Sequence, residues 1–203
     1  MDGLVEELVG IAGRELALLR PRDPEALLDE EAFDADEFMP YWAELWPSAL
    51  ALARAVGVRS LRGARVLELG CGLGLPSLAA ALAGGRVLAT DWAEDAIALL
   101  LRNAARNGVE LEALACSWTE PELLLSRAPF DLVLASDVLY EARNGEALLE
   151  LLPRLGAEVW LTDPGRATAE PFFEAVGAVF AVERRPAAEV PSGGLYRLSK
   201  LPG

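Results

Sequence analysis

A glycine-rich turn is the first feature of this sequence that could bind a ligand. The turn carries Gly70, Gly72 and Gly74, it follows the apolar residues 66–69, and a helical pattern comes directly after it. Glycines let a backbone turn sharply and approach a ligand closely, and the free N–H groups at the start of a helix favour an anionic group. The turn therefore predicts a site for a nucleotide-like cofactor.

Two carboxylates narrow the choice of cofactor. Asp91 closes the next apolar run, 21 residues after Gly70, where a carboxylate can accept hydrogen bonds from both hydroxyls of a ribose. Glu68 stands two residues before the first glycine. Its charge would be repelled by a pyrophosphate but attracted by an ammonium or a sulfonium. S-adenosylmethionine (SAM) carries both cations, and the G-x-G-x-G spacing differs from the G-x-G-x-x-G of dinucleotide sites, so SAM is the expected cofactor.

The composition excludes several other chemistries. The 203 residues include no His, which removes Ser-His and Cys-His nucleophile pairs, His metal ligands and an imidazole base. Two cysteines, Cys71 and Cys116, are too few for a disulfide framework or a zinc site, which favours a cytoplasmic protein without a metal. The formal charge of −14 disfavours nucleic acid, and no apolar run is long enough for a membrane span.

Alternating strand and helix patterns must position these residues. Continuous apolar runs are typical of strands that are covered on both faces. The expected strands are residues 66–69, 86–90, 111–116, 130–136 and 158–162, followed by residues 178–184 and 195–200 as an antiparallel pair at one edge. With helices between the runs, the pattern predicts an α/β fold with a doubly wound, mostly parallel seven-stranded Rossmann-like sheet.

Extra helices are expected at the N-terminus. Apolar residues over 4–19 recur at helical spacing and Pro21 would end that helix, while a second helix is expected over 48–56. We expect the first helix to pack on its own domain. The predicted organisation is an N-terminal helix and connection over residues 1–40 and one cofactor-binding domain over residues 41–203.

Four segments together resemble a known enzyme family. Residues 66–91, VLELGCGLGLPSLAAALAGGRVLATD, resemble the SAM-binding half of a class I, seven-β-strand methyltransferase. Residues 40–48 (PYWAELWPS) and 136–140 (SDVLY) are similar to motifs of the methyltransferase-like protein lysine methyltransferases, the second to their Asp-x-x-Tyr motif. Residues 163–166 (DPGR) resemble the branch that methylates the β-subunit of electron transfer flavoprotein. The resemblance covers about residues 38–200.

The resemblance implies a role for each matching position. The implied cofactor contacts are Trp46, Glu68, Gly70, Cys71, Gly72, Asp91, Trp92, Trp118 and Ser136. Among them, Asp91 would bind the ribose, Trp118 would flank the adenine, and Ser136 stands where the family suggests Gly or Ala. The implied catalytic residues are Asp137 and Tyr140: Asp137 would orient the incoming amine, and Tyr140 would form a wall of its channel.

The function implied by the resemblance is transfer of a methyl group from SAM to a protein lysine amine by in-line displacement. The first candidate partner is the β-subunit of electron transfer flavoprotein, and the oligomeric state stays open. A small-molecule amine N-methyltransferase is the main alternative. An NAD-dependent oxidoreductase would need the third glycine spacing and a proton donor such as a Tyr-x-x-x-Lys pair. A noncatalytic SAM-binding scaffold is disfavoured because Glu68, Asp91 and Asp137 are retained.

Overall fold

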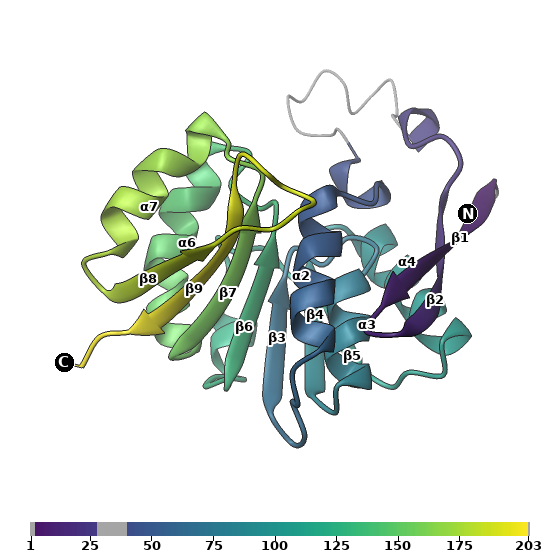
Figure 1. Ribbon diagram of the computed structural model, residues 1–203, viewed down its shortest axis with the longest axis horizontal. Coiled ribbons are helices and arrows are strands. Elements are labelled where there is room, and N and C mark those ends of the chain that lie inside the picture. The colour runs from purple at the N-terminus through teal and green to yellow at the C-terminus, as the bar shows by residue number, and fades with distance from the viewer. Residues whose placement is uncertain (1–2, 28–39, 203) are drawn as a thin grey trace.

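A seven-stranded sheet forms the centre of the molecule, with helices on both of its faces (Figure 1). The computed structural model describes residues 3–27 and 40–202. The strands are β3 (Arg65–Leu69), β4 (Arg86–Asp91), β5 (Glu112–Ala115), β6 (Leu132–Ser136), β7 (Glu158–Asp163), β8 (Phe180–Arg185) and β9 (Gly194–Lys200).

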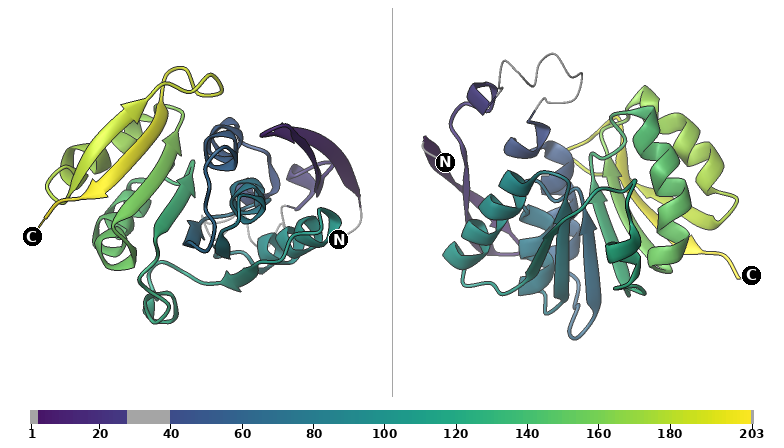
Figure 2. Two further views of the ribbon diagram at one scale, coloured as in Figure 1. Left: turned by 60° about the horizontal axis from the view of Figure 1, so that its bottom comes forward. Right: turned by 180° about the vertical axis from the view of Figure 1, so that it is seen from behind.

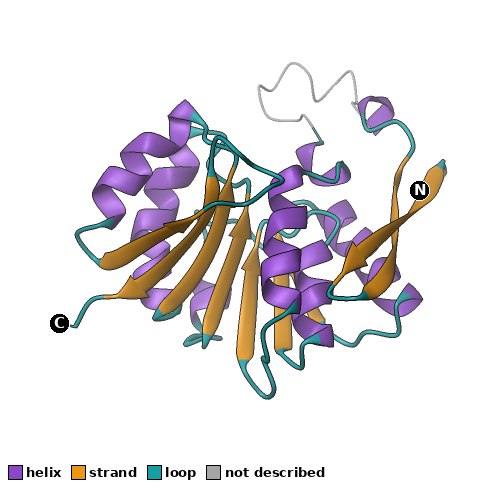
Figure 3. Ribbon diagram, in the orientation of Figure 1, coloured by secondary structure: helices purple, strands orange, loops and turns teal. Residues whose placement is uncertain are grey.

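The strand order confirms the predicted fold class. Across the sheet the strands lie in the order β5-β4-β3-β6-β7-β9-β8. The five strands from β3 to β7 are parallel, whereas β9 is antiparallel to both β7 and β8. The sheet is therefore doubly wound and mostly parallel, and the last two strands of the chain form the expected antiparallel pair at one edge (Figure 3).

Helices lie on both faces of the sheet (Figure 2). Both faces can be covered in this way because successive residues of a strand point to opposite faces. The helices are α2 (Pro47–Gly57), α3 (Leu75–Leu82), α4 (Glu94–Arg106), α5 (Glu122–Leu125), α6 (Ala142–Leu155) and α7 (Glu170–Val176). In β6, Val133 and Ala135 belong to the core that includes α6 and α7, while Leu132 and Leu134 pack with residues of α2. The helix predicted over 48–56 is confirmed as α2.

The helix predicted over residues 4–19 is wrong, because this segment forms a β-hairpin. Strand β1 (Leu4–Ile11) pairs with the antiparallel strand β2 (Arg14–Pro21) through a two-residue turn. The turn residues Ala12 and Gly13 have φ angles of 50° and 78°. Two successive positive φ angles are the signature of the tight hairpin turn whose twist matches that of its strands.

The burial of the hairpin explains why the helical spacing misled. Val9 and Ile11 of β1 and Leu16 and Leu18 of β2 are buried, so the buried residues alternate with more exposed ones. Leu8, which a helix would have placed on the apolar stripe, is 61% exposed. The apolar residues of this segment thus fit both a helical period of about 3.6 residues and a strand period of two. The tight turn at Ala12 and Gly13 is compatible with the strand period only.

Two asparagines, Asn103 within α4 and Asn107 directly after its last residue, join the hairpin to the rest of the fold. The Asn107 side chain accepts a hydrogen bond from the Ala17 N–H at 2.9 Å and donates one to the Ala17 carbonyl at 2.8 Å. Asn103 binds the N–H and the carbonyl of Leu19 in the same way, at 2.7 and 3.1 Å. Asn103 also donates to the carbonyl of Leu73, so one buried amide links the hairpin to the glycine turn.

Of the connection expected over residues 20–40, residues 28–39 lie outside the described residues. Within the described ranges, no helix combines the length and the apolar character that crossing a membrane requires.

We predict that Asn103→Ala lowers the free energy of unfolding by at least about 2 kcal/mol, because the buried Asn103 amide is lost and the backbone groups of Leu19 and Leu73 lose their partner. Urea denaturation followed by circular dichroism measures this loss. Asn107→Ala is the matched control, since the same deletion at a partly exposed position should cost less. Equal losses for the two variants would contradict the role assigned to Asn103.

Candidate active site

A cleft of about 1090 Å³ opens where the parallel strands β3, β4, β5 and β6 end. Ligands bind outside the carboxyl ends of strands in open α/β sheets, at the point where the strand order reverses. Here that point lies between β3 and β6. The residues singled out in the sequence that line the cleft are Trp46, Gly70, Cys71, Gly72, Asp91, Trp92, Trp118, Ser136, Asp137 and Tyr140.

A side chain at Gly70 or Gly72 in the glycine turn would crowd neighbouring atoms. Gly70 has a φ of 65°, and a Cβ atom there would lie 3.1 Å from Val138 Cγ1 and 3.6 Å from the Trp118 ring. A Cβ atom on Gly72, whose φ is 49°, would lie 3.1 Å from the carbonyl oxygen of Trp42. The turn thus brings bare backbone to the cleft, with the Trp118 indole near Gly70. This geometry fits a flat, nucleoside-like ligand.

Asp91 ties the glycine turn to the end of β4. One carboxylate oxygen accepts the Gly72 N–H at 2.9 Å, and the other accepts the Ala93 N–H at 3.1 Å. Burial raises the pKa of Asp91, and the hydrogen bonds from Gly72 and Ala93 oppose that rise. A carboxylate can accept about four hydrogen bonds, so the backbone donors of Gly72, Ala93 and Trp92 leave room for a further donor. Asp91 can therefore hold the turn and still accept hydrogen bonds from a ligand in the cleft.

Glu68 lies behind the turn. Its side chain is fully buried, and Oε2 accepts a hydrogen bond from the Ser77 hydroxyl of α3 at 2.5 Å. Oε1 has no hydrogen-bond partner among the described residues. Burial raises the pKa of Glu68 to about 8 although the bond from Ser77 opposes the rise, so the carboxyl is mostly protonated at neutral pH. Glu68 anchors α3 to β3, but its mostly neutral carboxyl does not supply the negative charge that its sequence position suggested, and it does not belong to the cleft lining. A direct cofactor contact by this residue stays a prediction.

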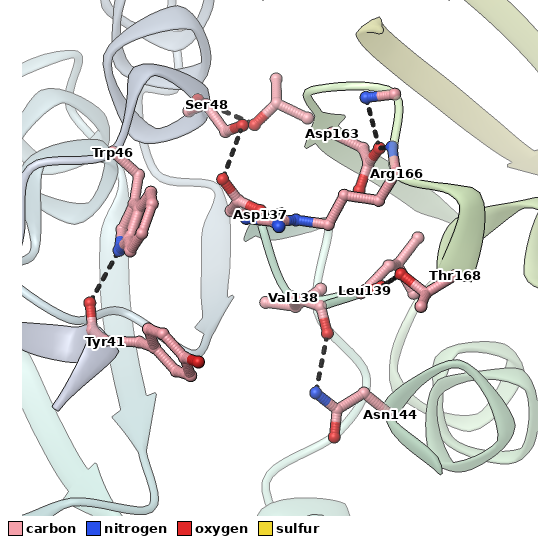
Figure 4. A network of polar contacts seen from close by, with 12 residues as sticks. Tyr41, Trp46, Ser48, Asp137, Val138, Leu139, Asn144, Asp163, Arg166 and Thr168 are labelled. Carbon is pink, nitrogen blue, oxygen red and sulfur yellow. Dashed lines mark hydrogen bonds and ion pairs between the residues drawn. The ribbon is translucent and has the colours of Figure 1, made fainter. Parts of the chain in front are cut away.

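Asp137 forms the centre of a polar network at the end of β6 (Figure 4). The Arg166 Nε atom donates to Oδ1 at 2.7 Å, and the Ser48 hydroxyl donates to Oδ2 at 3.2 Å. Asp137 has a φ of 57°, a left-handed conformation that non-glycine residues adopt rarely and mostly at constrained sites. The backbone therefore turns sharply at this residue, and its buried carboxylate joins α2, β6 and the loop after β7.

Asp163 holds the loop that presents Arg166. Its Oδ1 atom accepts the N–H groups of Gly165 and Arg166 at 2.7 and 2.9 Å. Its Oδ2 atom is buried without a hydrogen-bond partner in the described chain. Burial raises the pKa of Asp163 against these backbone bonds. The neighbouring Thr162 hydroxyl donates to the Ser48 carbonyl at 2.8 Å, which fixes the start of α2 against β7.

Aromatic side chains form one wall of the cleft. The Tyr41 ring lies 5.2 Å from that of Tyr140 and 6.1 Å from that of Trp46, measured between ring centroids. The Trp46 indole donates a hydrogen bond to the Tyr41 carbonyl at 2.7 Å, and the Arg166 guanidinium lies 6.0 Å from the Trp46 ring. Burial raises the pKa of Tyr140. Its phenol is therefore neutral at physiological pH and suits a wall better than a base.

Several residues of the cleft or its polar network stand within the quoted sequence motifs but received no role of their own. Among them are Tyr41 and Ser48 in residues 40–48 and Arg166 in residues 163–166. Their presence in the motifs was the only sign in the sequence that they belong to the site. Their contacts could not be predicted, because they join segments that are far apart in the chain. Over the described residues, no group of three or more His, Cys, Asp or Glu side chains is placed to hold a metal ion.

We predict that Glu68 makes stability fall as pH rises. Its pKa is about 8 in the folded protein against a reference value of 4.5, so the folded state binds the proton more tightly and loses this advantage between about pH 4.5 and 8. The loss should be on the order of a few kcal/mol. The chain has no His to titrate in this window.

Urea denaturation at pH 6 and at pH 8.5 measures this dependence. The matched variant is Glu68→Gln, which cannot titrate and should flatten it. An equal change in stability between the two pH values for the protein and the variant would contradict the buried carboxyl's role.

Comparisons with known proteins agree with this geometry. The family model described as lysine methyltransferase matches residues 39–164. The chain is 36% identical over 137 residues to the electron transfer flavoprotein beta subunit lysine methyltransferase of Xenopus laevis, with 63% of this chain and 54% of that protein covered. It is 35% identical over 138 residues to the histone-arginine methyltransferase METTL23 of Xenopus laevis, with 60% and 57% covered. The chain thus spans about half the length of these relatives.

A solved structure agrees on the fold. The 16S rRNA N2 G1207 methyltransferase RsmC of T. thermophilus, in complex with AdoMet and guanosine, superposes with a TM-score of 0.72 at 17% identity. The superposition covers 99% of this chain and 52% of that one. Together with the family match over residues 39–164, which include the glycine turn and Asp137, these findings show that the chain belongs to the lysine methyltransferase family.

Proposed function

We propose that this protein binds SAM in the cleft and transfers its methyl group to the side-chain amine of a lysine in another protein. The observation that carries the proposal is that one cleft joins two halves with different chemistry. One half has the glycine turn and Asp91, and the other has Asp137 beside an aromatic wall. Membership of the lysine methyltransferase family supports this assignment.

The first half suits the cofactor. When bound, SAM supplies a methyl group on a positively charged sulfur. An amine lone pair can form the new N–C bond to this methyl group while its bond to sulfur breaks, and no metal is needed. Asp91 has acceptor capacity left for the ribose hydroxyls. The bare backbone at Gly70 and the Trp118 ring would enclose the nucleoside, and Trp92, 48% exposed, would lie at the rim.

The second half suits an amine. A lysine must arrive neutral to use its lone pair, and burial against apolar walls lowers the pKa of an amine. Tyr41, Trp46 and Tyr140 supply such walls. The Asp137 carboxylate keeps acceptor positions that can orient an amine N–H. Most of the catalysis would then come from positioning.

The charge of the protein favours a cationic acceptor. The chain carries 18 basic against 32 acidic residues, a net charge of −14. Acidic side chains of the cleft lining include Glu44, Glu94, Glu120, Glu122 and Glu141. A negative surface raises the encounter rate with a positive partner at low salt. We propose the β-subunit of electron transfer flavoprotein as the first acceptor to test, in line with the named relative and with residues 163–166.

We predict that Asp91→Ala weakens the binding of SAM and of S-adenosylhomocysteine about tenfold to a hundredfold. The change removes charge-assisted hydrogen bonds, each worth about 1.5 to 3 kcal/mol. Isothermal calorimetry measures the affinities, and thermal unfolding checks that the variant is folded. Glu150→Ala, at an exposed position of α6, is the control for loss of one negative charge. Heat from NAD but none from SAM would contradict the cofactor assignment.

We predict that Asp137→Asn lowers the rate of methyl transfer at least about tenfold while SAM affinity changes little. The assay incubates the protein with methyl-labelled SAM and an electron transfer flavoprotein β-subunit, and mass spectrometry locates the label on the acceptor. Label on lysine is the expected result. Label on arginine, which the relation to METTL23 makes a relevant alternative, or on a small amine would overturn the lysine assignment. Equal losses of affinity and rate would move Asp137 into the cofactor site.

A further inference from the structure

Arg166 forms an ion pair with Asp137, the carboxylate that we propose to orient the acceptor amine. Its Nε atom lies 2.7 Å from Asp137 Oδ1, and the side chain of Asp137 is 6% exposed against 34% for Arg166. Both residues line the cleft. An amine that approaches Asp137 therefore meets a carboxylate whose charge is already balanced by a guanidinium.

The surrounding structure fixes this pair. Asp163 accepts the backbone N–H groups of Gly165 and Arg166. Gly165 packs so closely against the loop before β9 that a Cβ atom there would lie 2.9 Å from backbone atoms of Ser192. Burial lowers the pKa of Arg166, but the hydrogen bond and the charge of Asp137 outweigh it and hold the pKa above its usual value. The guanidinium therefore stays cationic wherever the enzyme is active.

The other charged and titratable groups near the pair do not replace Arg166. Asp163 lies behind the loop, outside the cleft lining, and its Oδ1 atom is occupied by backbone donors. Tyr41 and Tyr140 carry phenol groups and not cationic side chains, so neither can balance the charge of Asp137. On α6 and the residue before it, Arg143 pairs with Glu141, so these two charges balance each other.

We propose that Arg166 is a positioning residue that, by pairing with Asp137, keeps the acceptor site from stabilising an ammonium and so favours the neutral amine. The inference rests on the proposed lysine acceptor. An unpaired carboxylate within about 4 to 6 Å of an amine would raise the amine's pKa by about 1 to 3 units. An ammonium has no lone pair for the new N–C bond, so it must first release its proton to water. Paired with Arg166, Asp137 can still accept an N–H without that penalty.

The first test measures binding of n-butylamine, an analogue of the lysine side chain, to the cofactor-free protein at pH 7, where this amine is an ammonium ion. The test variants are Arg166→Gln and Arg166→Met; the second keeps an apolar chain beside Trp46. We expect both variants to bind n-butylammonium at least about tenfold more tightly than the unmodified protein, which corresponds to one pKa unit. Arg102→Gln is the control for the loss of one positive charge, because Arg102 is exposed on α4 outside the cleft lining, and the affinity of this variant should stay within about twofold.

The second test is the pH profile of methyl transfer. With Arg166→Gln the half-maximal rate should move to higher pH by about one unit, because the bound amine keeps its proton longer. Arg166→Lys, which keeps the charge, should restore the original profile. Thermal unfolding identifies any variant that fails to fold, and the remaining variant then carries the test.

The inference would be overturned if folded Arg166→Gln and Arg166→Met bound n-butylammonium no more tightly than the unmodified protein does. The binding test uses no cofactor and no protein acceptor, so it separates this inference from the proposed function. If the unmodified protein labels no lysine but the variants bind the ammonium more tightly, the proposed acceptor fails and the effect of Arg166 on Asp137 stands.

Discussion

The strands β3 and β6 lie side by side, and the whole candidate site depends on that contact. The glycine turn follows β3, and Asp137, in a left-handed conformation, follows β6. Because the strand order reverses between these two strands, the segments that follow them leave in opposite directions and a cleft opens between their ends. The half that we propose to bind the cofactor and the half that we propose to bind the amine are thereby brought to one edge of one sheet.

Buried carboxyl groups hold the loops around that edge. Glu68 anchors α3, Asp91 ties the glycine turn to β4, and Asp163 shapes the loop that carries Arg166. Glu68 and Asp163 each keep one buried oxygen without a partner in the described chain, which costs stability. Both residues lie beside the cleft without lining it. We infer that their unpartnered oxygens lower stability while their other hydrogen bonds fix the loop conformations before a ligand binds.

The sequence predicted the parallel sheet and most of the cleft because apolar runs mark buried strands and parallel strands end at the same edge. It failed where a contact between distant segments or a competing periodicity decided the structure. The hairpin over residues 4–21 carried a helical spacing that its turn overrode, and the pairing of Arg166 with Asp137 needs the fold before it can be seen. The burial of Glu68 was readable in principle, because alternation along β3 places it on the same face as the buried Val66.

The central claim is that one half of the cleft binds the cofactor and the other half binds the acceptor amine. A crystal structure of the protein with S-adenosylhomocysteine tests this claim most directly, because it shows which half the nucleoside occupies and where the sulfur lies. We expect the ribose hydroxyls on the carboxylate of Asp91 and the sulfur directed toward Asp137 and the aromatic wall. A nucleoside bound outside this cleft, or a sulfur directed away from Asp137, would contradict the account.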